Sequence, residues 1–297
     1  MAGESFREKA TDLASGAKDR VAGMKRDHRE AQDPIISRGR WALVTGASGG
    51  IGLCIAQRLA ERGMNIVAVA RNEDRLEDFA FHSPSKTEVL PADLSKASGR
   101  KAVAARCKAE DNPVDLLINN AGIWQFVSFG EMTQKDMHQM MDVNVTAVVE
   151  LSRAAVPGMV KRGHGGIVNI SSIAGFLPLP YEAVYGGTKA FVTSFSQGLY
   201  EELKDTGVLV SAIAPGLVRT ELHARTGGQE HVQGMPDRAW MSAEAVAEIV
   251  LRAIDKRDPL CVPGGMNKAL SALLDVVPTP MVRWTAAKVN RQRIPHD

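Results

Sequence analysis

Short apolar runs alternate with longer amphipathic stretches along most of this 297-residue chain. The runs are almost continuously apolar, which is typical of strands buried on both faces of a parallel sheet. They fall at residues 41–45, 65–70, 114–118, 166–170 and 208–213. Between them apolar residues recur at helical spacing, for example over 51–62, 133–155 and 184–204. The alternation predicts an α/β fold class, a doubly wound parallel sheet with helices on both faces in a single domain.

The same pattern divides the chain into three parts, residues 1–39, 40–262 and 263–297. The first is a polar extension whose apolar residues recur at helical spacing, namely Phe6, Ala10, Leu13, Ala17, Val21 and Met24. Two alternatives stay open for it, a weakly helical or disordered tail and a segment that docks on a partner or a membrane surface. The last part is an amphipathic, basic tail that could cover a pocket, extend a subunit contact or rest on a membrane surface.

Composition narrows the class of protein. Residues 1–40 hold nine Lys or Arg and seven Asp or Glu, which leaves the rest of the chain neutral, so no nucleic-acid partner is expected. The three cysteines are far apart and the seven histidines lack ligand spacing, so no metal and no disulfide framework are expected. No run approaches the ~18 apolar residues of a membrane span, and no secretory signal is apparent. These features predict a reducing, cytoplasmic location.

A glycine-rich loop separates the first predicted strand from the first predicted helix. Glycines allow a tight turn and let the backbone approach a pyrophosphate, while the helix start offers free N–H groups. In a strand–loop–helix unit such a loop predicts dinucleotide binding rather than an ordinary turn. The predicted cofactor-binding residues of the loop are Thr45, Gly46, Ser48, Gly50, Ile51 and Gly52.

The end of the second strand predicts which dinucleotide binds. An acidic residue there would accept a hydrogen bond from the ribose 2′-hydroxyl of NAD, but the chain has Ala70 and Arg71. An arginine can hold a 2′-phosphate through two charge-assisted hydrogen bonds, or it can be a solvated loop residue. We therefore expect NADP (NADPH) as the cofactor in preference to NAD.

Tyr185 and Lys189 lie four residues apart in a predicted helix and so share one face. A tyrosine with a pKa near ~10 is a poor acid or base at neutral pH, and an adjacent positive charge is expected to lower that pKa. The pair predicts a proton-transfer site. On its own the spacing also occurs in solvated helices, so the prediction depends on the motifs upstream.

Those motifs stand in the order and spacing of a known family. The chain has T-G-x-x-x-G-I-G at 45–52, N-N-A-G at 119–122, a serine thirteen residues before Tyr185, Y-x-x-x-K at 185–189 and P-G-x-x-x-T at 215–220. It resembles the short-chain dehydrogenase/reductase family of the non-extended type, strongly over residues 40–220, which implies a Rossmann fold. One departure is that Gly187-Thr188 precede the lysine, where relatives commonly have Ala-Ser. Gly186 and Gly187 indicate room for substrate or close packing.

The resemblance implies roles for individual residues. It places Asn144, Ser172, Tyr185 and Lys189 in the catalytic tetrad, with Ser171 the less favoured serine. Asn144 would hold a water that links Lys189 to solvent, and Lys189 would reach the nicotinamide ribose. Further cofactor-binding residues implied are Asp93, Leu94, Asn120, Ala121, Gly122, Pro215, Gly216, Val218 and Thr220, in addition to Arg71, Tyr185 and Lys189.

These roles predict hydride transfer between a nicotinamide and a carbonyl carbon, with Tyr185 supplying the proton and Ser172 binding the carbonyl oxygen. Apolar residues at 123–126 and 173–184 either pack in the protein or bind a small hydrophobic ketone, such as a 3-oxoacyl-type carbonyl, and its secondary alcohol. Residues 221–240 occupy the place of the family's mobile substrate lid. By resemblance, the helices that begin near residues 133 and 184 would form a homodimer or homotetramer.

Two other classes of function were weighed. A dinucleotide-binding regulator without catalysis would tolerate loss of the tetrad, and the tetrad is intact. A nucleotide-sugar epimerase or dehydratase of the extended branch would have T-G-x-x-G-x-x-G, which Gly46, Gly50 and Gly52 do not match. The sequence therefore favours an oxidoreductase.

Overall fold

A computed structural model describes residues 33–222, 236–265, 267–268 and 281 of the chain. The chain divides into two units, Met1–Pro34 and Ile35–Asp297, and the second contains all the described helices and strands. The predicted extension and C-terminal tail thus lie almost wholly outside the described residues, and the predicted domain limits stay predictions.

Seven parallel strands form the central sheet, in the order β3-β2-β1-β4-β5-β6-β9. Their bounds are β1 Trp41–Thr45, β2 Asn65–Ala70, β3 Thr87–Pro91, β4 Val114–Asn119, β5 Gly165–Ile170, β6 Val208–Ile213 and β9 Leu260–Cys261. The order reverses direction next to β1, which brings the carboxyl ends of β1 and β4 together at the point where open α/β sheets bind ligands. The predicted strands are confirmed, each within one residue of its expected limits.

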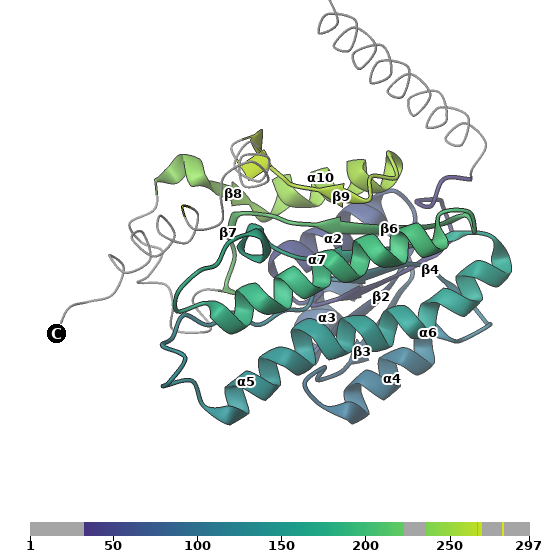
Figure 1. Ribbon diagram of the computed structural model, residues 1–297. Coiled ribbons are helices and arrows are strands. Elements are labelled where there is room, and N and C mark those ends of the chain that lie inside the picture. The colour runs from purple at the N-terminus through teal and green to yellow at the C-terminus, as the bar shows by residue number, and fades with distance from the viewer. Residues whose placement is uncertain (1–32, 223–235, 266, 269–280, 282–297) are drawn as a thin grey trace, which may run out of the picture. The chain divides into compact units, whose positions relative to one another are not determined.

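Helices cover both faces of the sheet, so the predicted doubly wound single-domain fold is confirmed (Figure 1). On one face α2, α3 and α10 pack against the sheet, and on the other α4, α6 and α7 do so. Their bounds are α2 Gly50–Glu61, α3 Glu73–His82, α4 Ala97–Cys107, α5 Gln134–Met141, α6 Ala147–Arg162, α7 Ala183–Leu203 and α10 Ala243–Asp255. In β1, Ala42 and Val44 belong to the first core and Leu43 to the second, as the pleat requires.

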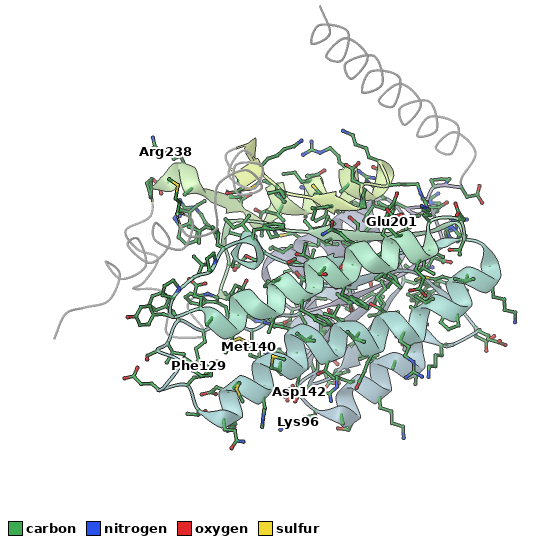
Figure 2. All side chains as sticks on the ribbon, in the orientation of Figure 1. Lys96, Phe129, Met140, Asp142, Glu201 and Arg238 are labelled. Atoms are coloured by element: carbon green, nitrogen blue, oxygen red, sulfur yellow. The ribbon has the colours of Figure 1, made fainter. Side chains whose placement is uncertain are left out.

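The helix predicted over residues 133–155 is interrupted. Five residues between α5 and α6, Asp142–Thr146, form a π-helical turn (η1). Such turns are rare insertions in α-helices and occur frequently at functional sites. Figure 2 shows Asp142 and Met140 on this stretch of helix, at the side of the molecule where α7 also begins. The turn contains Asn144, which the sequence analysis singled out.

A second, two-stranded parallel sheet pairs β7 (Leu217–Arg219) with β8 (Trp240–Ser242). It joins the two ends of the segment predicted to be a substrate lid. Residues 223–235 of that segment, including its glycines at 227, 228 and 234, lie outside the described residues. Among the helices that are described, none has both the length and the apolar character needed to cross a membrane.

Candidate active site

The glycine-rich loop turns sharply between β1 and α2. Gly46 and Gly50 have φ angles of 70° and 55°, a region that residues with side chains rarely adopt. A Cβ on Gly46 would lie 2.7 Å from Nδ2 of Asn120, and one on Gly50 would lie 3.1 Å from Cγ2 of Thr220. Only glycine fits these two positions against Asn120 and Thr220. The tight turn places the free backbone N–H groups of the first turn of α2 beside the loop.

Thr45 joins this loop to the N-N-A-G segment. Its hydroxyl accepts hydrogen bonds from the backbone N–H groups of Asn120 and Ala121 at 2.9 and 3.0 Å, and donates to the carbonyl of Ile118. The side-chain amide of Asn120 donates to the carbonyl of Thr45 at 2.9 Å. These bonds fix the carboxyl ends of β1 and β4 side by side. In this structure Thr45 and Asn120 hold the two segments together.

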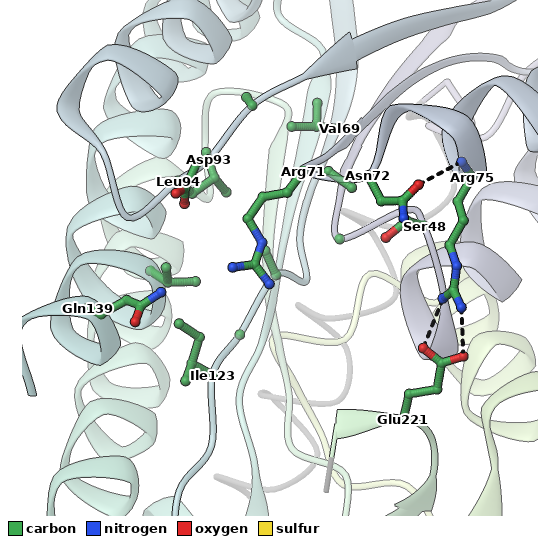
Figure 3. Close-up of a pocket in the computed structure, with 16 residues that line it drawn as sticks. Ser48, Val69, Arg71, Asn72, Arg75, Asp93, Leu94, Ile123, Gln139 and Glu221 are labelled. Carbon is green, nitrogen blue, oxygen red and sulfur yellow. Dashed lines mark hydrogen bonds and ion pairs between the residues drawn. The ribbon is translucent and has the colours of Figure 1, made fainter. Parts of the chain in front are cut away.

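A cavity of about 680 Å³ opens at these strand ends (Figure 3). It is lined by seven residues predicted to bind the cofactor, namely Gly46, Ser48, Arg71, Asp93, Leu94, Ala121 and Gly122. It is also lined by Val69, Ala70, Asn72, Arg75, Ala92, Ile123, Gln139, Val143 and Glu221, which the sequence analysis did not assign to it. The cavity is thus elongated from the end of β2 to the loop after β4.

The remaining predicted cofactor residues lie around the cavity rather than in its wall. Ile51 packs against the core under α2, and Val218 is buried there. Thr220 lies against Gly50, and the carbonyl of Pro215 accepts a hydrogen bond from the backbone of Ile173. A Cβ on Gly216 or on Gly52 would collide with Asn267 and Asn120, respectively.

Arg71 extends across the opening of the cavity from the end of β2 (Figure 3). On the opposite wall Asp93 accepts hydrogen bonds from the backbone and hydroxyl of Ser95 at 3.0 and 2.8 Å. Burial opposes ionisation of Asp93, but the bonds from Ser95 and the charge of Arg71 outweigh it and lower the pKa of this carboxyl. A cationic side chain thus lies at the end of the cavity where a 2′-phosphate was predicted.

Asn144 is held at the π-helical turn by bonds from both ends of its amide. Its Oδ1 accepts from the backbone N–H of Ile123 at 2.8 Å, and its Nδ2 donates to the carbonyl of Ile123 and to the hydroxyl of Thr188. Thr188 in turn donates to the carbonyl of Tyr185 at 2.7 Å. Asn144 therefore connects the loop after β4 to the first turn of α7.

Ser171 and Ser172 have different partners. Ser171 is turned into the protein, where its hydroxyl bonds to the carbonyl of Lys189 and to Thr193. Ser172 follows β5 and caps the turn at Ile173–Phe176, and its side chain acts to lower the pKa of Tyr185. The geometry therefore favours Ser172, as predicted, as the serine that shares a site with Tyr185.

Lys189 is buried, and its Nζ donates to the carbonyl of Ile170 at 2.9 Å. That Nζ lies 5.8 Å from the centre of the Tyr185 ring and 3.6 Å from a Cβ built on Gly122. Gly122 lines the cavity, so the ammonium lies just behind the cavity wall. None of the four predicted catalytic residues is among the described residues of that wall. The four residues lie together beside the end of the cavity that Gly122 lines.

The pKa of Tyr185 differs from the prediction. Burial raises it to about 12, the hydrogen bond with Ser172 acts in the lowering direction, and the charge of Glu182 raises it further. Burial also lowers the pKa of Lys189 to about 8. The predicted lowering of the tyrosine pKa by Lys189 is therefore wrong, because desolvation of the phenol dominates and Lys189 is not among the groups that shift this pKa. At neutral pH the phenol keeps its proton.

Trp124 and Glu182 lie within the segments 123–126 and 173–184 that were predicted to pack in the protein or to face a substrate, but their contact with each other was not predicted. Glu182 is buried just before α7, and its Oε2 accepts a hydrogen bond from the indole N–H of Trp124 at 2.8 Å. Tyr181 stacks on Phe126, with ring centres 5.5 Å apart. A buried carboxylate and aromatic contacts thus join the loop after β4 to the segment before Tyr185. The two segments are distant in sequence, so no local pattern predicts that they meet.

The residues fit a dinucleotide. The loop at 45–52 forms a cradle that Cβ atoms at Gly46 and Gly50 would fill, and Arg71 offers a cation at the far end of the cavity. Across the described residues, no group of three or more His, Cys, Asp or Glu side chains is placed to hold a metal ion.

Comparison with known proteins agrees with this geometry. Residues 40–231 match the family described as short chain dehydrogenase. The chain belongs to this family. Among relatives of known sequence, a short-chain dehydrogenase homologue, the very-long-chain 3-oxoacyl-CoA reductase of Mus musculus, is 36% identical over 190 residues, which cover 62% of this chain and 61% of that protein.

Two solved structures are similar to the chain. One is a short-chain dehydrogenase from Sphingobium yanoikuyae in complex with NADPH, with a TM-score of 0.71 and 34% identity over 80% of this chain and 96% of that one. The other is a bulky-bulky ketone specific alcohol dehydrogenase from Comamonas testosteroni, with a TM-score of 0.68 and 30% identity over 82% and 96%. Both support the Rossmann-like fold as well as the family.

Proposed function

We propose that the protein is an NADP(H)-dependent oxidoreductase that interconverts a hydrophobic ketone, of the 3-oxoacyl type or a similar bulky carbonyl, and its secondary alcohol. The observation that carries this proposal is the grouping of Ser172, Tyr185, Lys189 and Asn144 beside one end of a cavity whose other end carries Arg71. NADPH binding in a similar structure and the ketone specificity stated for another support the cofactor and the substrate class.

When bound, NADPH supplies a hydride to the carbonyl carbon. As negative charge develops on the carbonyl oxygen, the hydroxyls of Ser172 and Tyr185 donate hydrogen bonds to it. Tyr185 then transfers its proton to that oxygen, and the resulting phenolate is stabilised by the ammonium of Lys189. A phenol that keeps its proton at neutral pH suits the reductive direction. In the oxidative direction the same proton returns to Tyr185.

Aromatic and apolar residues support a hydrophobic substrate. Trp124, Phe126 and Tyr181 lie in contact next to the catalytic group, and Phe129, further along the same loop, is 68% exposed. Figure 2 shows Phe129 at the end of the molecule where α7 begins. The cytoplasmic location, a homodimer or homotetramer, and membrane contact through the termini stay predictions.

The test is turnover of a panel of carbonyl compounds with NADPH and NADH in parallel. Tyr185→Phe is expected to lower kcat by about 10²–10⁴-fold while the Kd for NADPH stays close to that of the wild type. Tyr181→Phe is the matched control, because it keeps the ring stacked on Phe126 and is expected to keep wild-type turnover. Wild-type kcat in Tyr185→Phe, or no turnover of any carbonyl by the wild type, would contradict the proposal.

A further inference from the structure

Two charged residues that the sequence analysis did not assign meet at the cavity wall. Arg75, in the first turn of α3, forms a two-pronged ion pair with Glu221, which follows Thr220 (Figure 3). Nη1 to Oε2 is 2.9 Å and Nη2 to Oε1 is 3.3 Å. Both residues line the same cavity as Arg71. The pair therefore links α3 to the segment after β7 at the edge of the proposed cofactor site.

The start of α3 places two arginines in the lining of the cavity. Asn72 lies between Arg71 and Arg75 in the chain and caps the helix, with its Oδ1 accepting from the backbone N–H of Arg75 at 2.9 Å. Ser48, from the glycine-rich loop, lines the same cavity. The cap fixes the backbone between the two arginines at the start of the helix. Both side chains line the cavity from either side of Asn72, with Arg71 pointing toward Asp93 and Ile123 and Arg75 meeting Glu221 (Figure 3).

The Arg75–Glu221 pair is open to exchange. The Arg75 side chain is 46% exposed and that of Glu221 is 53% exposed. Exposed ion pairs contribute little net stability, because solvent screens them and their side chains lose conformational freedom. A ligand with a higher negative charge and a similar arrangement of oxygens can replace the carboxylate. A phosphate monoester, with a charge of about −1.5 to −2 and three acceptor oxygens, meets both conditions.

We propose that Arg75 is a second determinant of NADP binding, and that the 2′-phosphate of NADP displaces Glu221 from its guanidinium. This inference rests on the proposed function and specifies how its cofactor is selected. Arg71 alone leaves part of the charge of a 2′-phosphate unbalanced, whereas Arg71 and Arg75 together match it. NAD, which has a hydroxyl at this position, leaves the ion pair intact. Glu221 thus competes with the 2′-phosphate of NADP for the guanidinium of Arg75. NAD carries no phosphate there that could displace Glu221.

The two substitutions are expected to change the affinity for NADPH in opposite directions and to leave the affinity for NADH unchanged. Arg75→Gln is expected to weaken NADPH binding by about tenfold or more and to leave NADH binding unchanged, because only the phosphate uses the guanidinium. Glu221→Gln is expected to tighten NADPH binding by about three- to tenfold, again with NADH unchanged, because the competing charge is gone. In the Arg75→Gln background, Glu221→Gln is expected to have no further effect on NADPH.

The experiment is calorimetric titration of the full-length protein with NADPH, NADH and 2′,5′-ADP at constant ionic strength. The third probe carries the 2′-phosphate without the nicotinamide, so it reports the phosphate site directly. Arg219→Gln is the matched control, because Arg219 forms a similarly exposed pair with Asp237 at 2.7 Å and is not among the described residues that line the cavity. That variant is expected to bind all three probes like the wild type.

Equal weakening of NADPH and NADH by Arg75→Gln would overturn the inference and make the ion pair a structural contact. An unchanged or weaker affinity of Glu221→Gln for NADPH would also overturn it. If the wild type prefers NADPH and Arg75→Gln keeps that preference in full, the proposed function stands and the role of Arg75 fails. If the wild type binds NADH as tightly as NADPH and does not bind 2′,5′-ADP, the proposed cofactor fails, and this inference fails with it.

Discussion

At the scale of single residues, Glu182 shows how a distant group acts on the reacting atom. Glu182 is buried near Tyr185. Two causes raise the pKa of Tyr185, namely the burial of its own phenol and the negative charge of Glu182. Because the carboxylate also accepts the indole N–H of Trp124, its position is set by the loop after β4. The site therefore includes a carboxylate that no catalytic motif contains.

Replacing Glu182 with glutamine is expected to lower the apparent pKa of Tyr185. The amide keeps an oxygen that can accept from Trp124 but removes the negative charge that disfavours the phenolate. The alkaline limb of the kcat profile for carbonyl reduction should therefore move to lower pH, and the basic limb of alcohol oxidation should move in the same direction. Trp124→Phe, which leaves the charge in place, is the comparison variant. A shift to higher pH in Glu182→Gln would refute the assignment.

Lys189 carries a cost in stability. Burial lowers its pKa from 10.5 to about 8, so between these values the unfolded chain holds a proton that the folded chain has released. By linkage, the unfolding free energy rises with pH across this window and the penalty is fully present below about pH 8. Burial of Lys189 therefore lowers the stability of the fold below that pH.

Lys189→Met is expected to raise the unfolding free energy at pH 7 by about 1–2 kcal/mol, because the gain from removing the buried charge exceeds the loss of the bond to Ile170. The advantage over the wild type should shrink between about pH 8 and 10.5. Urea unfolding at several pH values measures both effects. A destabilised variant at pH 7 would show that the ammonium is better solvated than its burial indicates.

At the scale of elements, most of the strands could be predicted because each is a short apolar run buried on both faces. The π-helical turn over Asp142–Thr146 could not, since apolar residues continue through it at near-helical spacing and one extra residue per turn leaves no clear mark. The β7–β8 sheet was also missed, because each of its strands is only three residues long and pairs with one distant in sequence. That Asn144, Ser172, Tyr185 and Lys189 lie together could be predicted from motif spacing, whereas the places of Glu182, Arg75 and Glu221 depend on contacts made only in the fold.

The two adjacent glycines of α7 have different environments. A Cβ on Gly186 would lie 3.1 Å from the carbonyl oxygen of Ala174, whereas one on Gly187 would meet nothing within 4 Å. Of the two alternatives predicted, close packing therefore describes Gly186. Gly187 is exposed and leaves space outside the helix.

Alanine at these positions is expected to have opposite effects. Gly187→Ala should stabilise the protein by about 0.5–1 kcal/mol, because alanine favours the helix and meets no neighbour. Gly186→Ala should destabilise it by about 1–3 kcal/mol, because α7 must move away from Ala174. Thermal unfolding of the pair measures the difference. Equal effects of the two substitutions would show that the α7 contact is looser than the structure indicates.

At the scale of the whole molecule, the core extends to the first described residues. Ile35 is 3% exposed and packs in the core beside Gly166, which lacks a side chain where the isoleucine lies. Residue 35 was predicted to belong to the N-terminal extension, because a single isoleucine before a polar stretch has no periodicity to identify it. The described structure gives it a part in the core of the domain.

Ile35→Ala is expected to lower the unfolding free energy by about 2–4 kcal/mol through lost burial and a residual cavity. Phe81→Ala removes a larger side chain, but one that is 86% exposed, and should change stability by less than about 0.5 kcal/mol. Chemical denaturation of both variants tests the contrast. A neutral Ile35→Ala would mean that the segment before β1 contributes little to the domain.

The contact of Thr220 with Gly50 has a consequence for biosynthesis. The cradle at the start of α2 emerges early from the ribosome, but the residues that close around it, Thr220 and Glu221, emerge only after most of the sheet has been made. On the proposed function, a nascent chain is expected to gain tight dinucleotide binding only at that late stage. From then on the ligand would favour the native state by mass action.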